Sequence, residues 1–336
     1  MANLFEAYLT QHAHDMDTYL LGYFDHASHK DMEQYLYGPL KSYSKNAGKR
    51  HRPLICLMAC KAVGGDPKRA LSTAAAIEHF HSAALIHDDI ADESLLRRGE
   101  PCMHITQGLG LAINAGDLAL SLVNGSVLRD PLLDDSLKVK VVTELIDMTE
   151  RTIEGQALDL GWARDGRFDI SIEDYLVMIK HKTAFYSGAV PLALGALIGG
   201  GSLEQVESLR SFGMLSGLAF QIQDDLLNLI GKEESVKKDF RSDITEGKRT
   251  LMVVHALEHS NEASKLKELL ASKTHEDADK EAAVEIMRAS GSLDFAHSYA
   301  LDLTKRAKEQ LVNIDLGAEE KELFLSMADF FVERLS

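Results

Sequence analysis

Apolar residues recur at helical spacing along almost the whole chain. Leu54, Leu57 and Met58 lie three and four residues apart along the chain, which is the pattern of a helix with one buried face. Alternating apolar and polar runs flanked by hairpin turns, which are typical of strands, are missing from the sequence. The expected helices cover residues 3–27, 30–45, 52–63, 67–92, 110–129, 135–160, 171–199, 203–230, 248–259, 261–272, 277–290, 292–313 and 317–334.

Helix breakers and capping residues agree with this interpretation. The chain has only six prolines, and none lies after Pro191, which favours consecutive helices because proline interrupts them. Asp66 before a proline is typical of a helix start, and Ser171 and Ser202 begin capping-box patterns. No low-complexity linker or short-period repeat divides the chain. We therefore expect an all-α fold, a single large helical bundle, with one domain over residues 1–336.

Composition and charge narrow the range of functions. Among 336 residues, 52 are acidic and 36 are Lys or Arg, which gives a net charge of −16 and excludes a general nucleic-acid binder. Cys56, Cys60 and Cys102 are too few for a disulfide framework, and the N-terminus lacks the features of a signal peptide. Glycines and Pro191 interrupt the uncharged stretch 183–203, which predicts a buried helix and a turn rather than a membrane span. We expect a cytoplasmic protein.

Three aspartates end the helix expected over residues 67–92. Asp88 and Asp92 are four residues apart, and Asp89 and Asp92 are three apart, so the carboxylates share one helical face. They repel one another at a helix C-terminus, where the helix dipole also disfavours anions. A divalent cation would stabilise this arrangement, because Mg²⁺ prefers carboxylate oxygens and bridges them to substrate phosphates.

A second acidic cluster follows another apolar helix much later in the chain. Asp224 and Asp225 repeat the aspartate pair, and Asn228 takes the third position. A solvated acidic face is the alternative interpretation for either cluster alone. Two similar clusters that each end an apolar helix favour a metal site.

Basic residues gather beside both clusters and in one upstream segment. Arg97 and Arg98 follow the first cluster, Lys238 and Lys248 follow the second, and residues 48–53 read Gly-Lys-Arg-His-Arg-Pro. In a chain of net charge −16 this local basicity is informative, because Arg and Lys bind phosphate oxygens. Surface solubility is the alternative for any single basic run. Acids that hold Mg²⁺ beside cations that hold anions predict a diphosphate site.

These segments, in this order, resemble the trans-isoprenyl diphosphate synthases of the polyprenyl synthetase family, and the stretch 224–250 is similar to geranylgeranyl diphosphate synthases. The resemblance implies the isoprenoid synthase fold, an all-α bundle around a deep central cavity, and a homodimer. It also implies a Mg²⁺-dependent prenyltransferase that joins isopentenyl diphosphate to a C5 to C15 allylic diphosphate and makes an all-trans prenyl diphosphate. The matching segments are 48–53, His81, 88–92 with Arg97 and Arg98, 115–117, 155–159, 182–183, 221–225 and 238–248.

The resemblance further implies a role for each matching residue. The metal ligands, for three Mg²⁺ ions with diphosphate bound, are Asp88, Asp89, Asp92, Asp224 and Asp225. The catalytic residues, which face the allylic diphosphate or the carbocation, are Lys182, Thr183, Gln221 and Lys238. The substrate-binding residues are Gly48, Lys49, Arg52, His81, Arg97, Arg98 and Lys248. Residues 231–247 are expected to form a lid, and Asn228 replaces an aspartate that often ends the second motif.

Product length is expected to depend on side chains that precede the first aspartate cluster. Short-chain enzymes of this family carry bulky aromatics four or five residues before the motif, where this chain has Ala84 and Ala83. One turn deeper, Phe80 is positioned to form the floor of the cavity. The resemblance therefore points to a C20 product, geranylgeranyl diphosphate, with C15 and C25 to C30 products as alternatives.

Three other functions are compatible with parts of the pattern. A terpene cyclase shares metal-bound diphosphate ionisation but needs no isopentenyl diphosphate site, so Lys49, Arg52 and Arg98 argue against it. A non-catalytic regulatory subunit of a prenyl synthase usually loses one aspartate motif, and this chain keeps both. A helical scaffold without ligands leaves the clustered acids and cations unexplained.

Overall fold

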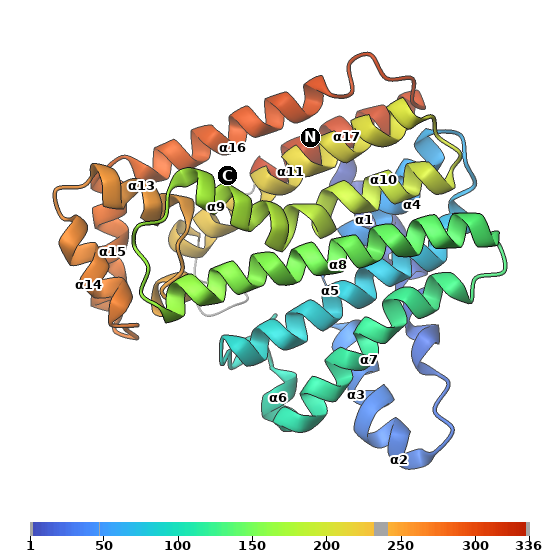
Figure 1. Ribbon diagram of the computed structural model, residues 1–336, viewed down its shortest axis with the longest axis horizontal. Helices are drawn as coiled ribbons and strands as arrows, with labels where there is room; N and C mark the ends of the chain where they lie inside the picture. Colours follow the sequence, from blue (N-terminus) through green and yellow to red (C-terminus); the bar gives the residue numbers. More distant parts are fainter. Residues whose placement is uncertain (1–2, 47, 232–240, 334–336) are drawn as a thin grey trace.

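The structure, a computed structural model, describes residues 3–46, 48–231 and 241–333. This part of the chain is almost entirely helical, which confirms the expected all-α fold (Figure 1). The α-helices are α1 (Leu4–Leu21), α2 (Lys30–Met32), α3 (Gly38–Lys45), α4 (His51–Ala62), α5 (Leu71–Ala91), α6 (Met103–Thr106), α7 (Leu109–Leu128), α8 (Asp135–Arg164), α9 (Ile172–Ile179), α10 (Val190–Ile198), α11 (Leu203–Ile230), α12 (Ser242–Thr245), α13 (Leu251–His259), α14 (Ala263–Ala271), α15 (Asp277–Ala289), α16 (Ser292–Glu309) and α17 (Ala318–Val332).

Several short elements interrupt this pattern. Two 3₁₀ turns, η1 (Gly22–Phe24) and η3 (Pro67–Ala70), lie next to α1 and α5, and two π-helical segments, η2 (Glu33–Tyr37) and η4 (Lys180–Ala189), lie within longer helices. A two-stranded antiparallel hairpin, β1 (Leu96–Arg97) and β2 (Glu100–Pro101), follows α5. The sequence did not predict this hairpin, α6 or α12, because elements of two to four residues carry no periodic signal.

The long helices pack against one another in pairs, and the most extensive pair contains α5. This helix crosses the middle of the molecule and is buried along most of its length (Figure 1). It packs most extensively against α7, α11 packs against η4 and α16, and α10 packs against α4. Helices α13, α14 and α15 gather at one end of the molecule (Figure 1). Most predicted site residues lie on α5, η4 and α11, and Arg52 lies on α4.

Two glycine contacts set the close spacing of the elements that carry the site. A β-carbon on Gly155 of α8 would lie 2.1 Å from the backbone nitrogen of Lys182. One on Gly188 of η4 would lie 2.1 Å from the carbonyl oxygen of Gly213 on α11. Real side chains do not tolerate such distances, so only glycine allows η4 to pack directly against both helices.

The structure shows how the expected buried segment and one further apolar helix are placed. The uncharged stretch 183–203 forms η4, α10 and a turn, and its helical part is buried as expected. Among the described helices, α7 alone is long and apolar enough to cross a membrane, and 44% of its most apolar window is buried. A single such helix is weak support for a membrane span, because core helices have the same length and composition. The thiols of Cys56 and Cys60 are buried as expected, and that of Cys102 is buried too.

Candidate functional site

The first aspartate cluster lies at the C-terminal end of α5, where Asp92 caps the helix. Asp89 is buried and accepts a 2.6 Å hydrogen bond from Nε of Arg97, a residue of the hairpin that follows. Asp88 is partly exposed, accepts a 2.8 Å bond from Gln156 of α8 and lies 3.6 Å from the Arg97 guanidinium. The guanidinium of Arg97 therefore lies against the acidic cluster in this structure.

Two lysines from distant segments reach the same cluster. Nζ of Lys182 lies 2.5 Å from Oδ2 of Asp159 and 3.9 Å from Oδ1 of Asp88. Nζ of Lys248 lies 3.0 Å from Oδ2 of Asp92 and 3.7 Å from the same Asp159 oxygen. The buried carboxylate of Asp159 thus holds Lys182 and Lys248 close to two of the predicted metal ligands, Asp88 and Asp92.

These ion pairs shift the pKa values of the buried groups. Burial alone would raise the pKa of Asp159, but the facing Lys182 and Lys248 lower it overall. Burial opposes the charged form of both lysines, yet Asp159 and the neighbouring carboxylates raise the pKa of each. The pKa of Asp92 is raised, chiefly by burial, although Lys248 lowers it. The lysines and Asp159 are therefore charged at neutral pH.

The second aspartate cluster lies on α11, close to Ile230 at the end of that helix. Asp224 is exposed, whereas Asp225 is buried and accepts hydrogen bonds from the hydroxyl of Tyr175 at 2.8 Å and from Nε2 of Gln221 at 2.7 Å. Burial raises the pKa of Asp225 to about 7, even though both hydrogen bonds lower it. The hydroxyl of Thr183 donates a 2.7 Å bond to Oε1 of Gln221. The orientation of the Gln221 amide is thus fixed at both ends.

Adjacent residues of η4 connect the two clusters, since Lys182 faces Asp88 and Thr183 reaches Gln221, the partner of Asp225. The π-helical backbone of η4 carries both residues, and such segments often occur at functional sites. Within the described ranges, no three His, Cys, Asp or Glu side chains converge closely enough to hold a metal ion by themselves. The available donors are carboxylate oxygens, which fit Mg²⁺ when phosphate oxygens complete its coordination.

A cationic group lies between α4 and α5. Its member on α5, His81, precedes Asp88 by about two helical turns. Arg52 of α4 is buried and donates to Oγ of Ser187 at 3.0 Å and to the hydroxyl of Tyr186 at 3.3 Å. Its Nη1 lies 3.1 Å from Nε2 of His81, and the guanidinium stacks on the Tyr186 ring at 4.8 Å. The nearby cations Arg98 and Arg97 also face His81.

The protonation state of His81 follows from this contact. Burial and the facing Arg52 hold the pKa of His81 well below its usual value, so the ring is neutral. A guanidinium only donates hydrogen bonds, so Nε2 accepts and the ring proton lies on Nδ1. Nδ1 is buried and has no hydrogen-bond partner in the part of the chain that the structure describes. A neutral donor is therefore left for a ligand.

The remaining predicted cations have different surroundings. The guanidinium of Arg98 lies beside Gly48, 3.6 Å from where a β-carbon would be, and donates to the carbonyl of Asn46. Lys49 lies apart from this group, because its Nζ is 2.7 Å from Oε1 of Glu6 and 4.7 Å from the centre of the Phe330 ring. Lys238 lies outside the described residues.

Asn228, which replaces an aspartate that often ends the second motif, forms hydrogen bonds with the start of α12. Its side-chain oxygen accepts a 3.2 Å hydrogen bond from the backbone of Asp243, and its amide nitrogen donates to Ser242 at 3.2 Å. These bonds fix the start of α12, which lies within the segment expected to form a lid. The side-chain oxygen of Asn228 therefore already accepts from a backbone group.

The predicted chain-length residues lie along α5. Phe80 is buried and packs edge-on against the Tyr186 ring, with 5.4 Å between ring centres. Ala83 is fully buried in an apolar cluster that includes Ala115 and Ala119 of α7. Ala84 keeps part of its surface accessible. The role of these residues in setting chain length stays a prediction.

Sequence reasoning missed several buried groups beside the site. Glu78 and Arg50 form an ion pair next to the cationic group, Tyr186 orients Arg52, and Glu246 lies 2.8 Å from Lys248. Asp159 was recognised only as part of a motif, without a role. Its spacing of three residues from Gln156, which places both on one helical face, was the signal that could have revealed it.

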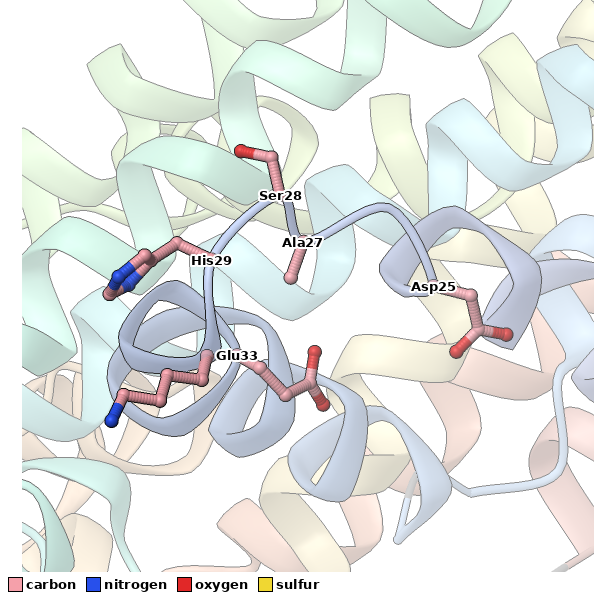
Figure 2. A pocket seen from close by; sticks show the side chains of 6 residues that line it. Asp25, Ala27, Ser28, His29 and Glu33 are labelled. Atoms are coloured by element: carbon pink, nitrogen blue, oxygen red, sulfur yellow. The ribbon is translucent and has the colours of Figure 1, made fainter.

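A separate pocket of about 330 Å³ lies at the turn between η1 and α2. Figure 2 shows Asp25 and His29 at opposite sides of it, on a loop that also carries Ala27 and Ser28. None of the predicted site residues lines this pocket. It is therefore distinct from the acidic and cationic groups described above.

The chain is similar to known proteins over most of its length. Residues 33–287 match the family described as polyprenyl synthetase. A short chain isoprenyl diphosphate synthase from Methanothermobacter thermautotrophicus is 40% identical over 287 residues, which cover 85% of this chain and 86% of the relative.

Solved structures give the same result for the fold. Geranylgeranyl pyrophosphate synthetase from Pyrococcus horikoshii superposes with a TM-score of 0.88 at 34% identity, and 98% of each chain is covered. Geranylgeranyl pyrophosphate synthase from Corynebacterium glutamicum, solved with isoprenyl diphosphate and magnesium, superposes with a TM-score of 0.86 at 28% identity, with 99% of each chain covered. The likeness extends over nearly the whole molecule.

Proposed function

This chain belongs to the polyprenyl synthetase family, and we propose that it condenses isopentenyl diphosphate with an allylic diphosphate to make an all-trans prenyl diphosphate. The observation that carries this proposal is the arrangement of charge. Two aspartate clusters are connected through Lys182 and Thr183, and a buried cationic group around Arg52 and His81 lies next to one of them. This arrangement suits two diphosphates held side by side.

The allylic diphosphate binds on the acidic side of the site, together with magnesium. Asp88, Asp92 and Asp224 are the principal magnesium ligands, and Asp89 and Asp225 support them. The donor set fits this ion, and the relative from Corynebacterium glutamicum was solved with magnesium. When bound, magnesium supplies Lewis-acid stabilisation of the leaving diphosphate.

Cationic side chains complete the binding of both diphosphates. Lys182, Lys248 and Arg97 turn from their carboxylate partners to the allylic diphosphate, joined by Lys238 from outside the described residues. The second diphosphate, that of isopentenyl diphosphate, binds to Arg52, Arg98, the Nδ1 proton of His81 and the backbone at Gly48. Lys49 turns from Glu6 to join them.

The chemistry proceeds through a carbocation. The allylic carbon–oxygen bond breaks, diphosphate leaves, and the double bond of isopentenyl diphosphate forms a new carbon–carbon bond to the cation. Oxygen dipoles of Thr183 and Gln221 face the positive charge, and their mutual hydrogen bond holds them in place. A proton then leaves the isopentenyl unit, and the departing diphosphate accepts it. No protein base is required.

The product proposed is geranylgeranyl diphosphate, with 20 carbons. Two structural neighbours carry that product in their names, and one relative is named as a short-chain enzyme. The small side chain of Ala84 leaves room beside α5, and Phe80 with its partner Tyr186 closes this space one turn deeper.

The active protein is proposed to be a homodimer of one-domain chains. Val139, Ile146, Ile153 and Leu160 recur every seven residues on α8, and each is exposed. Seven residues are close to two helical turns, so these side chains form one apolar stripe along the helix. A second copy of the chain covers the stripe with its own, as a two-fold interface requires. Three buried thiols suit a cytoplasmic, reducing location.

Removal of single carboxylates tests this function. Asp88→Asn and Asp224→Asn are expected to lower kcat for elongation with magnesium by at least about 100-fold, because each removes a ligand that stabilises the leaving diphosphate. Asp277→Asn, which changes a fully exposed acid on α15, serves as the matched control with unchanged kcat. Full activity of both site variants would contradict the proposal.

A further inference from the structure

One acid stands among the cations that are proposed to bind isopentenyl diphosphate. Glu78 lies on α5, one turn before His81, and its side chain is only 5% exposed. Its Oε1 lies 2.6 Å from Nη1 of Arg50, and its charge also acts on Arg98. An anion in this place repels a diphosphate, so substrate binding alone does not explain it.

The partner of Glu78 joins four segments of the chain. Arg50 is the residue before α4, and its side chain is 1% exposed. Its Nε donates to Asp17 of α1, its Nη1 donates to Glu78 of α5, and its Nη2 donates to the carbonyl of Ser44 at the end of α3. Each of the three guanidinium nitrogens donates to a protein group and the side chain is buried, so Arg50 does not reach a substrate.

The backbone of Arg50 has an unusual conformation. Its φ of 53° and ψ of 28° lie in the left-handed region, which residues other than glycine rarely adopt. The three side-chain contacts compensate for the cost of this conformation. The left-handed turn sets the direction in which α4 starts, and therefore separates Lys49 on one side from Arg52 on the other. Arg52 then points at His81, Tyr186 and Ser187.

We propose that Glu78 is a positioning residue for the isopentenyl diphosphate subsite. With Asp17 it holds Arg50 in the left-handed conformation, and Arg50 in turn fixes Arg52 and the backbone at Gly48. Glu78 contacts no substrate and acts through Arg50 alone. This role rests on the function proposed above. It adds Glu78, which lies outside both aspartate clusters, to the residues that shape the isopentenyl diphosphate subsite.

An electrostatic role and a positioning role for Glu78 predict opposite changes in affinity when its charge is removed. If Glu78 acted only through its charge, Glu78→Gln would remove a repulsive anion, and isopentenyl diphosphate would bind more tightly. If Glu78 positions the subsite, the same change releases Arg50, and binding weakens. The sign of the change in affinity therefore decides between the two roles.

The test is calorimetric titration of isopentenyl diphosphate into the full-length protein, with magnesium and a non-reactive farnesyl thiolodiphosphate in the other subsite. Glu78→Gln is expected to raise the Kd for isopentenyl diphosphate by about tenfold or more, as the loss of a buried charge partner does. The Kd for the farnesyl analogue is expected to stay within about twofold of the wild-type value, because its ligands lie on the acidic side.

Two further variants complete the experiment, one as a second test of the positioning role and one as a control. Asp17→Asn keeps the pair between Glu78 and Arg50, so it is the milder change, and it is expected to raise the same Kd by a smaller factor. It carries the test if Glu78→Gln does not fold. Glu320→Gln removes a similarly buried acid, paired with Lys61 at 2.6 Å far from the subsite, and is expected to leave both Kd values unchanged.

Each outcome has a defined meaning. A lower or unchanged Kd for isopentenyl diphosphate in both site variants overturns the positioning role, and so does an equal loss of affinity for both ligands. Wild-type protein that binds isopentenyl diphosphate but does not elongate any primer overturns the proposed function and leaves this test intact. Wild-type protein that does not bind isopentenyl diphosphate overturns both.

Discussion

Nζ of Lys248 lies 3.0 Å from Oδ2 of Asp92, although the two residues are 156 positions apart in the chain. Glu246 and Asp159 place two more carboxylate oxygens at 2.8 and 3.7 Å from the same nitrogen. In the protein without ligands, a lysine thus already neutralises one of the proposed metal ligands. A divalent cation has to compete with Lys248 for Asp92.

This competition predicts two opposite effects for Lys248→Met. Without diphosphate, the variant should bind Mg²⁺ about fivefold more tightly, because a repelling cation has been removed from a metal ligand. With inorganic pyrophosphate present, the metal complex should be weaker, because a cation that holds the anion is missing. Calorimetry of both titrations measures this, with Lys267→Met, on the exposed side of α14, as the control. Weaker magnesium binding under both conditions would argue against the competition.

Product length should depend on the floor beside α5. Phe80→Ala removes the ring that packs on Tyr186 and should lengthen the product by one or more five-carbon units. Ala84→Phe fills accessible space one turn nearer the aspartates and should shorten the product. Mass spectrometry of the prenyl diphosphates measures both effects. Unchanged products in both variants would show that the floor lies elsewhere.

Ala83→Phe, which the sequence alone suggests as a shortening variant, has a different expected result. Ala83 is fully buried in the apolar cluster with Ala115 and Ala119. A phenyl ring there overpacks the contact between α5 and α7, which should lower the stability by about 1–3 kcal/mol. Urea unfolding should show this loss for Ala83→Phe and a smaller one for Ala84→Phe. Equal stabilities would mean that Ala83 faces open space.

Stability should fall at mildly acidic pH because of His79. Burial, helped by the facing Arg50, lowers the pKa of His79 to about 3, against an ordinary value near 6.5. Below pH 6.5 the unfolded chain binds a proton that the folded chain does not, so stability decreases as the pH falls from 6.5 towards 3. The loss is about 1.4 kcal/mol per pH unit for this one residue.

His79→Leu removes this proton-binding difference. Its free energy of unfolding, measured in urea at pH 7.5, 6 and 5, should depend less steeply on pH than that of the wild type. Part of the slope should remain, because the pKa of His81 is also lowered by burial and by Arg52. Identical slopes for the two proteins would show that His79 is protonated in the folded state.

The proposed homodimer should separate when a charged side chain is placed in its apolar stripe on α8. Ile153 is 59% exposed on α8, and Ile153→Lys would place a lysine of each protomer in the two-fold interface. Light scattering should then give the mass of one chain in place of two. Val312→Lys, at an equally exposed apolar position on another face, is the control that should remain dimeric. A wild-type protein that is already monomeric would refute this interface.

The sequence predicted the long helices well because each buries an amphipathic face that repeats over several turns. It also located the groups that the structure brings together, since Asp88, Lys182 and Gln221 belong to segments with a recognisable order. The hairpin after α5 and the short α12 escaped prediction because their formation depends on neighbouring segments. α12, for example, starts where Asn228 accepts a hydrogen bond from Asp243.

Contacts between segments that are far apart in the sequence could not be predicted either. The placement of Lys49 beside Glu6, and of Arg50 between Asp17 and Glu78, depends on how α1 lies against α4 and α5. Nothing in the local sequence distinguishes Arg50, which is buried in ion pairs, from its basic neighbours in the same segment. The division of that segment into a structural arginine and substrate-binding residues required the packed molecule.

Elongation of prenyl diphosphates by this chain would be measured first, through the chain length of its product. Purified protein would be incubated with Mg²⁺, isopentenyl diphosphate and, separately, the C5, C10 and C15 allylic diphosphates, and the products identified by mass spectrometry. A dominant C20 prenyl diphosphate is expected from each primer, and no product is expected when magnesium is chelated. Folded protein that elongates none of the three primers would contradict the proposed function.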